Sequence, residues 1–282
     1  MEIALAFLAG LLIGSFLNVC IFRLPRDLSV ASPARSFCPG CETTIAWYDN
    51  IPLLSFAMLR GRSRCCKEAI PLRYPVVEFS TAIAFAASVA LFGVTLESLK
   101  YCLYSAIMID LVVTDFEVRI LPDEFTLGGT LLGLALAWWV PMELDAAPIL
   151  FFFLGMQPEE RVFSLVESAL GAAIPSLLLW FVAWAFEKIR HKEGMGFGDI
   201  KMMALIGSFF GLRPALFTLV LASVVSAVTG PIFAIIAKRK LVARLARTLG
   251  YRRAASAVVF HYQLPLGSYL GVAALIWAFW PR

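Results

Sequence analysis

Residues 2–22 read EIALAFLAGLLIGSFLNVCIF, a stretch in which Glu2 is the only charged residue. A helix of about 20 apolar residues crosses the roughly 30 Å hydrocarbon core of a bilayer. No basic residue precedes this stretch and no small-residue cleavage site ends it, so it lacks the pattern of a cleaved signal peptide. We therefore expect residues 2–22 to remain in the membrane as an anchor.

The same apolar character continues along the chain of 282 residues, of which 60% are hydrophobic and 16% are charged. Soluble domains carry about 25% charged residues. Residues 149–156 are apolar but too short to span, and residues 200–212 are also short, so the span count can move by one and an interfacial helix remains open. The fold class we expect is all-α integral membrane, with about eight transmembrane helices near residues 2–22, 75–93, 101–115, 124–141, 165–186, 200–212, 214–236 and 264–280.

Lysine and arginine are concentrated in two segments between the predicted spans. Residues 23–73 carry eight of them, and residues 238–253 carry seven without any acid. Because cytoplasmic loops are enriched in these residues, both segments are predicted to face the cytoplasm, together with the turns at 115–123 and 187–199. Residues 141–164 then face outward. The net charge of +4 is explained by these loops, with some attraction to anionic lipid, rather than by nucleic-acid binding.

The spans divide the chain into three predicted parts. Residues 1–22 form the first transmembrane helix, residues 23–74 form a cytoplasmic Cys-rich loop domain, and residues 75–282 form a transmembrane bundle. The loop domain is too small to bury a core of its own, and domains of this size usually need a metal, a disulfide or a docking surface. We identify no internal repeat in the sequence.

Four of the six cysteines lie in this loop domain, at Cys38, Cys41, Cys65 and Cys66. Two thiolate pairs separated by some twenty residues are typical of a tetrahedral structural zinc site, so we predict a small zinc-ribbon-like insertion. A regular second Cys-x-x-Cys would need cysteine at Ser63, so loss of the metal remains an alternative, as do unpaired thiols. A disulfide is disfavoured in the reducing cytoplasm.

Ionisable residues inside or at the edge of a membrane span are functional candidates, because burying them in a bilayer is costly. Four acids qualify here: Glu78, Asp110, Asp115 and Asp199. Asp115 ends the third predicted span seven positions before Pro122, and Asp199 follows a glycine-rich run that begins at Gly194. In the predicted topology both aspartates face the cytoplasm.

Two carboxylates held close together do not both ionise easily, so a pair can share one proton near neutral pH. One can then act as general base on a water while its protonated partner polarises a peptide carbonyl, which makes Asp115 and Asp199 the predicted catalytic pair of an aspartyl protease. Two other interpretations remain open, with Asp199 as a helix N-cap and Asp115 as an interfacial residue at the end of a span. The sequence has neither a His-Glu-x-x-His nor a Gly-x-Ser-x-Gly motif, which argues against metallo and serine proteases.

Four motifs together resemble the bacterial type IV prepilin peptidase family, the leader peptidase and N-methyltransferase group of Gly-x-Gly-Asp proteases. They are residues 14–25 (GSFLNVCIFRLP), residues 73–78 (RYPVVE), Asp115 with Pro122 and Asp123, and residues 196–201 (GFGDIK). The resemblance covers nearly the whole chain. The sequence departs from the family pattern at the second cysteine pair, and at residues 266–269 (LGSY) in place of a Gly-Pro-Phe type sequence.

The resemblance implies a bifunctional enzyme of the bacterial inner membrane. Family members cut the short basic leader from prepilins and pilin-like secretion proteins at the cytoplasmic face, and Asp115 and Asp199 match their protease pair. They then methylate the new N-terminal residue with S-adenosylmethionine as methyl donor. Two alternatives are a non-enzymatic transporter or scaffold in which the aspartates carry protons or bind cations, and a methyltransferase that has lost proteolysis.

Overall fold

The computed structural model describes residues 1–33, 35–191, 196–249 and 266–280, and for residue 231 and residues 233–249 it describes the backbone only. Within these ranges the regular elements are helices, and the only strand-like contacts are two isolated β-bridges. Residues 194–195 of the glycine-rich run, residues 250–253 of the basic segment, His261 and the start of the last predicted span lie outside the described residues. In chain order the helices are α1 (Glu2–Arg23), the short turns η1 (Leu24–Arg26) and η2 (Trp47–Asn50), α2 (Leu54–Met58), α3 (Arg73–Phe92), α4 (Leu96–Val118), α5 (Asp123–Leu136), α6 (Ala147–Leu154), α7 (Glu160–Arg190), α8 (Phe197–Phe210), α9 (Leu212–Leu249) and α11 (Leu266–Ala278).

A helix lies at each of the eight stretches that the sequence predicts as spans, namely α1, α3, α4, α5, α7, α8, α9 and α11. By length and composition, four segments of the described chain are able to cross a membrane: Glu2–Arg26, Arg73–Phe92, Glu160–Arg190 and Leu212–Gly230. The protein is therefore an all-helical membrane protein with at least these four candidate spans. Helices α5 and α8 have only 14 residues each, and α4 carries five charged residues along its 23 positions.

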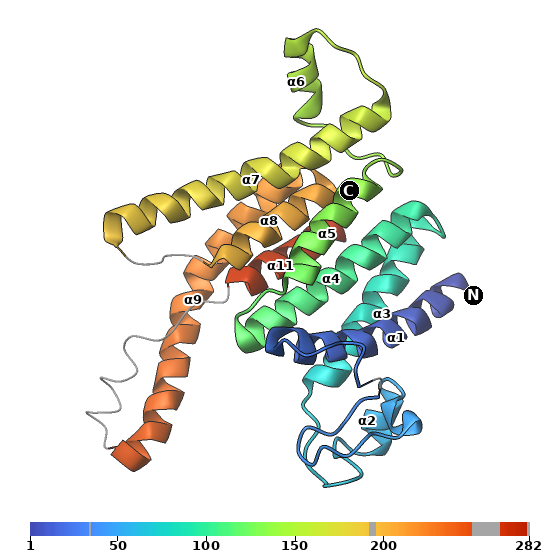
Figure 1. Cartoon of the computed structure of the whole chain (residues 1–282), viewed down its shortest axis with the longest axis vertical. Helices are drawn as coiled ribbons and strands as arrows, with labels where there is room; N and C mark the ends of the chain where they lie inside the picture. Colours follow the sequence, from blue (N-terminus) through green and yellow to red (C-terminus); the bar gives the residue numbers. More distant parts are fainter. Residues whose placement is uncertain (34, 192–195, 250–265, 281–282) are drawn as a thin grey trace.

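Two elements differ from the simplest interpretation of the sequence. The apolar residues 149–156 largely lie in α6, an eight-residue helix at the end of the molecule opposite the Cys-rich segment (Figure 1). Helix α9 continues through the basic segment to Leu249, so the backbone of residues 238–249 is helical rather than a loop. Nothing in the first half of that segment breaks a helix, since it contains neither glycine nor proline before Gly250.

The main core surrounds α4, which packs against α1, α3, α5 and α11 (Figure 1). Helix α8 and α11 contribute most of the other fully buried side chains, including Met202, Phe209 and Leu270. Helices α7 and α8 cross at Gly171 and Gly207, where a Cβ on Gly207 would come within 1.8 Å of the Gly171 carbonyl oxygen. Small residues of this kind allow membrane helices to approach closely. This packing brings the start of α8 and the start of α11 to the end of α4.

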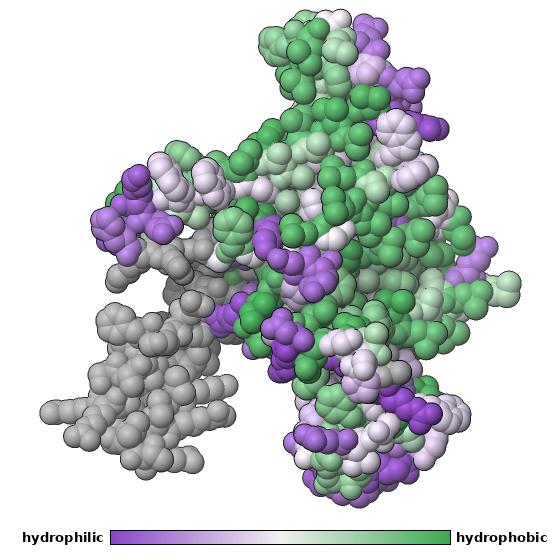
Figure 2. Space-filling model, in the orientation of Figure 1, coloured by the Kyte–Doolittle hydropathy of each residue, from purple (hydrophilic) through white to green (hydrophobic). Residues whose placement is uncertain are grey.

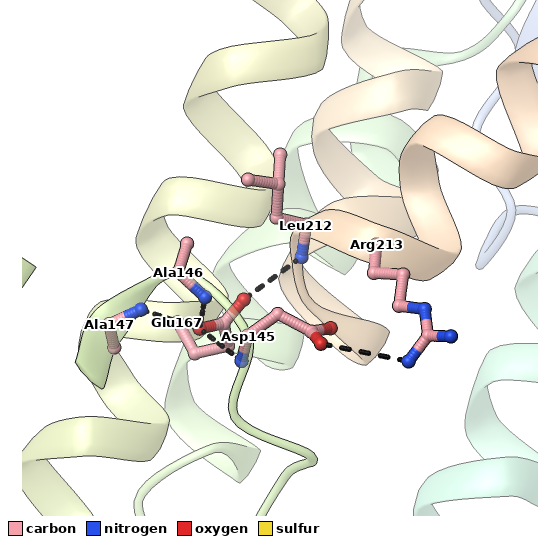
Figure 3. Close-up of polar contacts among 6 residues, drawn as sticks. All are labelled: Asp145, Ala146, Ala147, Glu167, Leu212 and Arg213. Carbon is pink, nitrogen blue, oxygen red and sulfur yellow. Dashed lines mark hydrogen bonds and ion pairs between the residues drawn. The ribbon is translucent and has the colours of Figure 1, made fainter. Parts of the chain in front are cut away.

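One buried carboxylate joins three elements at the end of the bundle where α6 lies. Glu167 of α7 is fully buried, and its Oε2 accepts hydrogen bonds from the backbone N–H groups of Asp145, Ala146 and Ala147 at 3.1, 2.8 and 2.8 Å (Figure 3). Its Oε1 accepts a fourth from the N–H of Leu212 at 3.2 Å. These donors begin α6 and α9, so one side chain satisfies amides at the starts of two helices.

The segment between α1 and α3 presents more polar side chains than the helical middle of the molecule does. Figure 2 shows hydrophobic side chains over the helical middle of the molecule and mostly polar ones over the part that contains α2. At the start of this segment the buried guanidinium of Arg23 donates hydrogen bonds to the backbone oxygens of Ser29, Val30 and Arg35. The Cys-rich segment therefore folds against the end of α1 instead of extending away from it.

Candidate active site and cysteine cluster

Asp115 lies in the last turn of α4 and is buried, with 6% of its surface exposed. The helix begins at a capping box formed by Thr95 and Ser98 and ends at Arg119, whose left-handed conformation (φ 60°) stops it. The N–H of Arg119 donates to the carbonyl oxygen of Asp115. Helix termination therefore fixes the aspartate at the end of the central helix.

Asp199 lies in the first turn of α8, which begins with Gly196 as its N-cap. Asp199 is therefore not the N-cap of this helix, and no side chain forms a capping hydrogen bond there. The Cα of Gly198 faces the side chain of Leu121, since a Cβ at this position would lie 3.0 Å from a Leu121 methyl group. This contact places the start of α8 next to the loop that follows Asp115.

The two aspartates meet at the first turn of α11, on the buried residue Gly267. A Cβ added to Gly267 would lie 3.1 Å from Oδ2 of Asp115 and 3.2 Å from Oδ1 of Asp199. Both carboxylates thus face the same point, 84 positions apart in sequence. A side chain on Gly267 would press on both carboxylates, which would have to shift by a few tenths of an ångström to accommodate it.

Ser268, the next residue, bonds one of the two carboxylates. Its backbone N–H donates to Oδ2 of Asp115 at 2.6 Å, and its hydroxyl lies 2.8 Å from the same oxygen and 3.1 Å from the carbonyl oxygen of Val112. No comparable hydrogen bond to the carboxylate of Asp199 is found among the described residues. The two acids therefore have different surroundings. In the sequence, Ser268 stands out only as part of residues 266–269 (LGSY), which depart from the family pattern, and this signal predicts no role for it.

The other acidic candidates have structural partners. Glu78 of α3 is buried, and its Oε2 accepts the N–H of Leu53 at 2.8 Å. Asp110 is fully buried on α4, where the hydroxyl of Thr114 lies 3.5 Å from its Oδ2. Neither is brought to Gly267 by any contact within the described ranges. Lys201 of α8 forms a 2.6 Å ion pair with Asp123 at the start of α5.

The four cysteines of the Cys-rich segment converge. The Sγ atoms of Cys38, Cys41, Cys65 and Cys66 all lie within 4.8 Å of one another. The Cys41–Cys65 distance is 3.2 Å, the Cys38–Cys66 distance is 3.6 Å and the Cys65–Cys66 distance is 4.0 Å. Four sulfurs around a tetrahedral zinc ion at about 2.3 Å would lie ~3.8 Å apart. The residues therefore fit a zinc ion in number, chemistry and spacing.

The cluster is built from two turns with the same pattern of backbone hydrogen bonds, a repeat that is not evident in the sequence. One turn is closed by a bridge between Phe37 and Thr44, and the other by a bridge between Arg62 and Ala69, 25 positions later. The first has hydrogen bonds from Cys38 N–H to Thr43 O and from Glu42 N–H to Cys38 O. Equivalent bonds in the second run from Ser63 N–H to Glu68 O and from Lys67 N–H to Ser63 O.

This correspondence explains the irregular cysteine spacing. Ser63 occupies the position of Cys38, Cys66 occupies that of Cys41, and Cys65 stands where the first turn has Gly40. The thiol missing at Ser63 is thus supplied from two positions further along the same turn. The hydroxyl of Ser63 lies 3.1 Å from the sulfur of Cys66.

Hydrogen bonding gives the cysteine thiols of the cluster different pKa values. Hydrogen bonds from Thr43 lower the pKa of Cys41 to about 6, and hydrogen bonding from Ser63 lowers the pKa of Cys66. The contact with Cys41 instead raises the pKa of Cys65 to about 12. Metal binding would displace the remaining protons, because thiolates rather than thiols are the ligands.

Comparison with known proteins gives matches over most of the chain. The model of the family described as "Bacterial Peptidase A24 N-terminal domain" matches residues 8–92. The model of the "Type IV leader peptidase family" matches residues 102–230. A prepilin leader peptidase/N-methyltransferase of Klebsiella pneumoniae is 37% identical over 227 residues, which cover 77% of this chain and 89% of that protein. One of Xanthomonas campestris pv. campestris is 32% identical over 295 residues, 96% of this chain and 88% of that protein. No solved structure matches.

Proposed function

This chain belongs to the type IV leader peptidase family, and from that premise we propose that it is a membrane-bound prepilin leader peptidase and N-methyltransferase. Its substrates are prepilins and pilin-like secretion proteins, from which it removes the short basic leader. It then methylates the new N-terminal residue. The observation that carries the peptidase assignment is the meeting of Asp115 and Asp199 at Gly267, where no side chain separates the two carboxylates.

The different hydrogen bonds of Asp115 and Asp199 suggest which of them is the base and which is the acid. Oδ2 of Asp115 accepts the N–H and the hydroxyl of Ser268, so this oxygen is not the site of the shared proton. Asp115 is accordingly the base that removes a proton from the attacking water, and Asp199 is the acid that protonates the carbonyl oxygen of the scissile bond. When the tetrahedral intermediate collapses, the C–N bond breaks and the proton held by Asp115 passes to the departing amine. One hydroxyl group of the intermediate returns its proton to Asp199 as it becomes the new carbonyl.

The location of the pair suits a substrate whose apolar helix remains in the bilayer. We assign eight spans to α1, α3, α4, α5, α7, α8, α9 and α11 and place the Cys-rich segment in the cytoplasm of a bacterial inner membrane. The arginines and lysines of residues 23–73 support this orientation. The domain division follows, with the first helix at 1–22, the Cys-rich loop domain at 23–74 and the protease bundle at 75–282.

The proposed function also implies that the protein binds a zinc ion and S-adenosylmethionine. A structural zinc ion held by Cys38, Cys41, Cys65 and Cys66 would tie the two turns of the loop domain together. S-adenosylmethionine would supply the methyl group, with a C–S bond broken and an N–C bond formed at the neutral N-terminal amine. The chain's part in that step is to hold the donor and the amine side by side.

The test separates the two activities with the full-length protein in detergent. Asp115→Asn and Asp199→Asn are each incubated with a prepilin, and leader removal is followed by mass. Each variant is expected to cut at least about 10³-fold more slowly than the wild type, while both still methylate a pre-cut substrate. Asp145→Asn, at the far end of the bundle, is the matched control. Cleavage at the wild-type rate by either dyad variant would refute the assignment.

A further inference from the structure

A cavity of about 430 Å³ lies between the Cys-rich segment and the adjoining ends of α1 and α3. Its walls come from Ser15, Asn18 and Val19 on α1, from Tyr74 and Glu78 on α3, and from the loop domain. Small-molecule sites usually measure about 300–1,000 Å³ and combine apolar walls with a few placed polar groups. This cavity has the size of a site for a nucleoside-sized ligand.

Glu78 places a carboxyl group in the wall of the cavity without a cationic partner among the described residues. Glu78 is only 7% exposed, and its Oε2 accepts the N–H of Leu53. Within the described residues no lysine or arginine forms an ion pair with it. A buried carboxylate is costly unless it is paired, so this position favours a ligand that brings a positive charge.

A second polar group at the cavity is incompletely bonded. Asn18 is 2% exposed, and its Nδ2 donates to the backbone oxygens of Gly14 and Tyr74. Its Oδ1 is buried and has no hydrogen-bond partner in the part of the chain that the structure describes. A buried acceptor of this kind is satisfied when a ligand supplies an N–H or O–H donor.

The loop domain adds aromatic walls to these polar groups. Phe22, Phe37, Tyr48 and Phe56 all line the cavity. Flat aromatic side chains suit a purine ring, and they also attract a cationic centre through the negative face of the ring. Charge, aromatic surface and volume together match a purine nucleoside that carries a positive charge.

The cavity lies close to the proposed peptidase dyad. Arg73, the first residue of α3, forms an ion pair with Glu117, which follows Asp115 by two positions on α4. This ion pair places the start of α3, which carries the cavity residues Tyr74 and Glu78, beside the end of α4 that carries Asp115. A donor bound in the cavity would be near the amine that it must methylate.

We propose that this cavity is the binding site for S-adenosylmethionine, with the sulfonium centre facing Glu78 and the adenine among the aromatic walls. This inference rests on the proposed N-methyltransferase function and names the residues that serve it. The cavity requires the folded loop domain, because Cys38 and Cys65 also line it. The peptidase dyad contributes none of its walls.

The test measures binding to the purified full-length protein in detergent, by equilibrium dialysis, with two probes. S-adenosylmethionine carries the sulfonium charge, and S-adenosylhomocysteine lacks it. Glu78→Gln keeps an oxygen for the N–H of Leu53 and removes the charge. It is expected to weaken binding of S-adenosylmethionine on the order of tenfold or more and to change binding of S-adenosylhomocysteine much less.

A second pair of variants tests the location without altering any charge. In Val19→Trp, the larger side chain on α1 fills the cavity. This variant is expected to bind both probes more weakly, on the order of tenfold or more. Phe16→Trp places the same side chain on the outer face of α1, where Phe16 is 51% exposed, and should bind both probes as the wild type does. Retained leader cleavage shows that each variant is folded.

The outcomes separate this proposal from the function on which it rests. If the wild type binds neither probe and transfers no methyl group, the methyltransferase assignment itself fails. If the wild type binds S-adenosylmethionine and both Glu78→Gln and Val19→Trp bind it equally well, the donor lies elsewhere. If these variants instead lose only the binding of a peptide with the mature pilin N-terminus, the cavity holds the methyl acceptor and the proposal is wrong.

Discussion

The sequence alone identifies the two aspartates as functional candidates, but it does not identify Ser268. The aspartates are polar residues at the ends of apolar stretches, so the cost of burying charge makes them visible in the sequence. Ser268 is a small residue at the start of a helix, where serine is common for local reasons. Its bonds to Asp115, 153 positions away, depend on α11 packing against α4. Only the tertiary structure reveals them.

Removing the hydroxyl of Ser268 tests whether it positions the catalytic carboxylate. Ser268→Ala retains the backbone N–H bond and loses one hydrogen bond to Asp115, so kcat for leader cleavage should fall about tenfold with little change in KM. Ser268→Thr restores a hydroxyl and should recover most of the rate. An unchanged kcat in Ser268→Ala, measured with a purified prepilin, would show that the hydroxyl bond does not serve catalysis.

The helices themselves were largely predictable, because each apolar stretch coincides with one. Their ends and contacts were not. Residues 238–253 have a helix-like sequence, but a solvated loop was the favoured interpretation because runs of lysine and arginine between spans are usually loops. The structure instead extends α9 through residues 238–249. Nor did the sequence reveal that the two turns of the Cys-rich segment repeat one design. Their similarity lies in backbone hydrogen bonds and shares only one cysteine position.

The interaction of Glu167 with the starts of α6 and α9 makes a prediction about stability (Figure 3). Glu167→Ala would leave four backbone N–H groups near a fully buried position without their acceptor, so the free energy of unfolding should fall by at least about 3 kcal/mol. Glu167→Gln retains an acceptor and should lose less. Thermal unfolding in detergent measures both, with the exposed Glu160→Ala as control. Equal melting temperatures for Glu167→Ala and the wild type would contradict this role.

At the scale of the whole molecule, the two proposed activities occupy separate parts that share one end of the bundle. The dyad depends on α4, α8 and α11, whereas the donor cavity depends on the loop domain with α1 and α3. The sequence separates these parts through its composition, since residues 23–74 are polar and cysteine-rich within an apolar chain. It contains no signal for the cavity, whose lining residues come from segments that meet only on folding.

Loss of the metal should therefore affect the two activities unequally. Cys65→Ser removes one ligand of the cluster and should abolish zinc binding, measured by metal analysis of the purified protein. Methyl-donor binding should weaken with it, while leader cleavage remains within about twofold of the wild type.

The repeated turn supplies the matched control. Adding Ser63→Cys to Cys65→Ser places thiols at both positions that correspond to Cys38 and Cys41, so zinc should bind again. Equal zinc content in the wild type and in Cys65→Ser alone would show that Cys65 is not a ligand.

The contacts of Gly267 with both aspartates and of Ser268 with Asp115 also bear on how the protein is made. Translation completes the segment with Asp115 first and the segment with Asp199 much later, and neither then has its final neighbour. The ribosome must pass residue 268 before α11 can insert and close the site. The proposed dyad is thus complete only after α11 has packed against α4, so the growing chain would gain peptidase activity late in its synthesis.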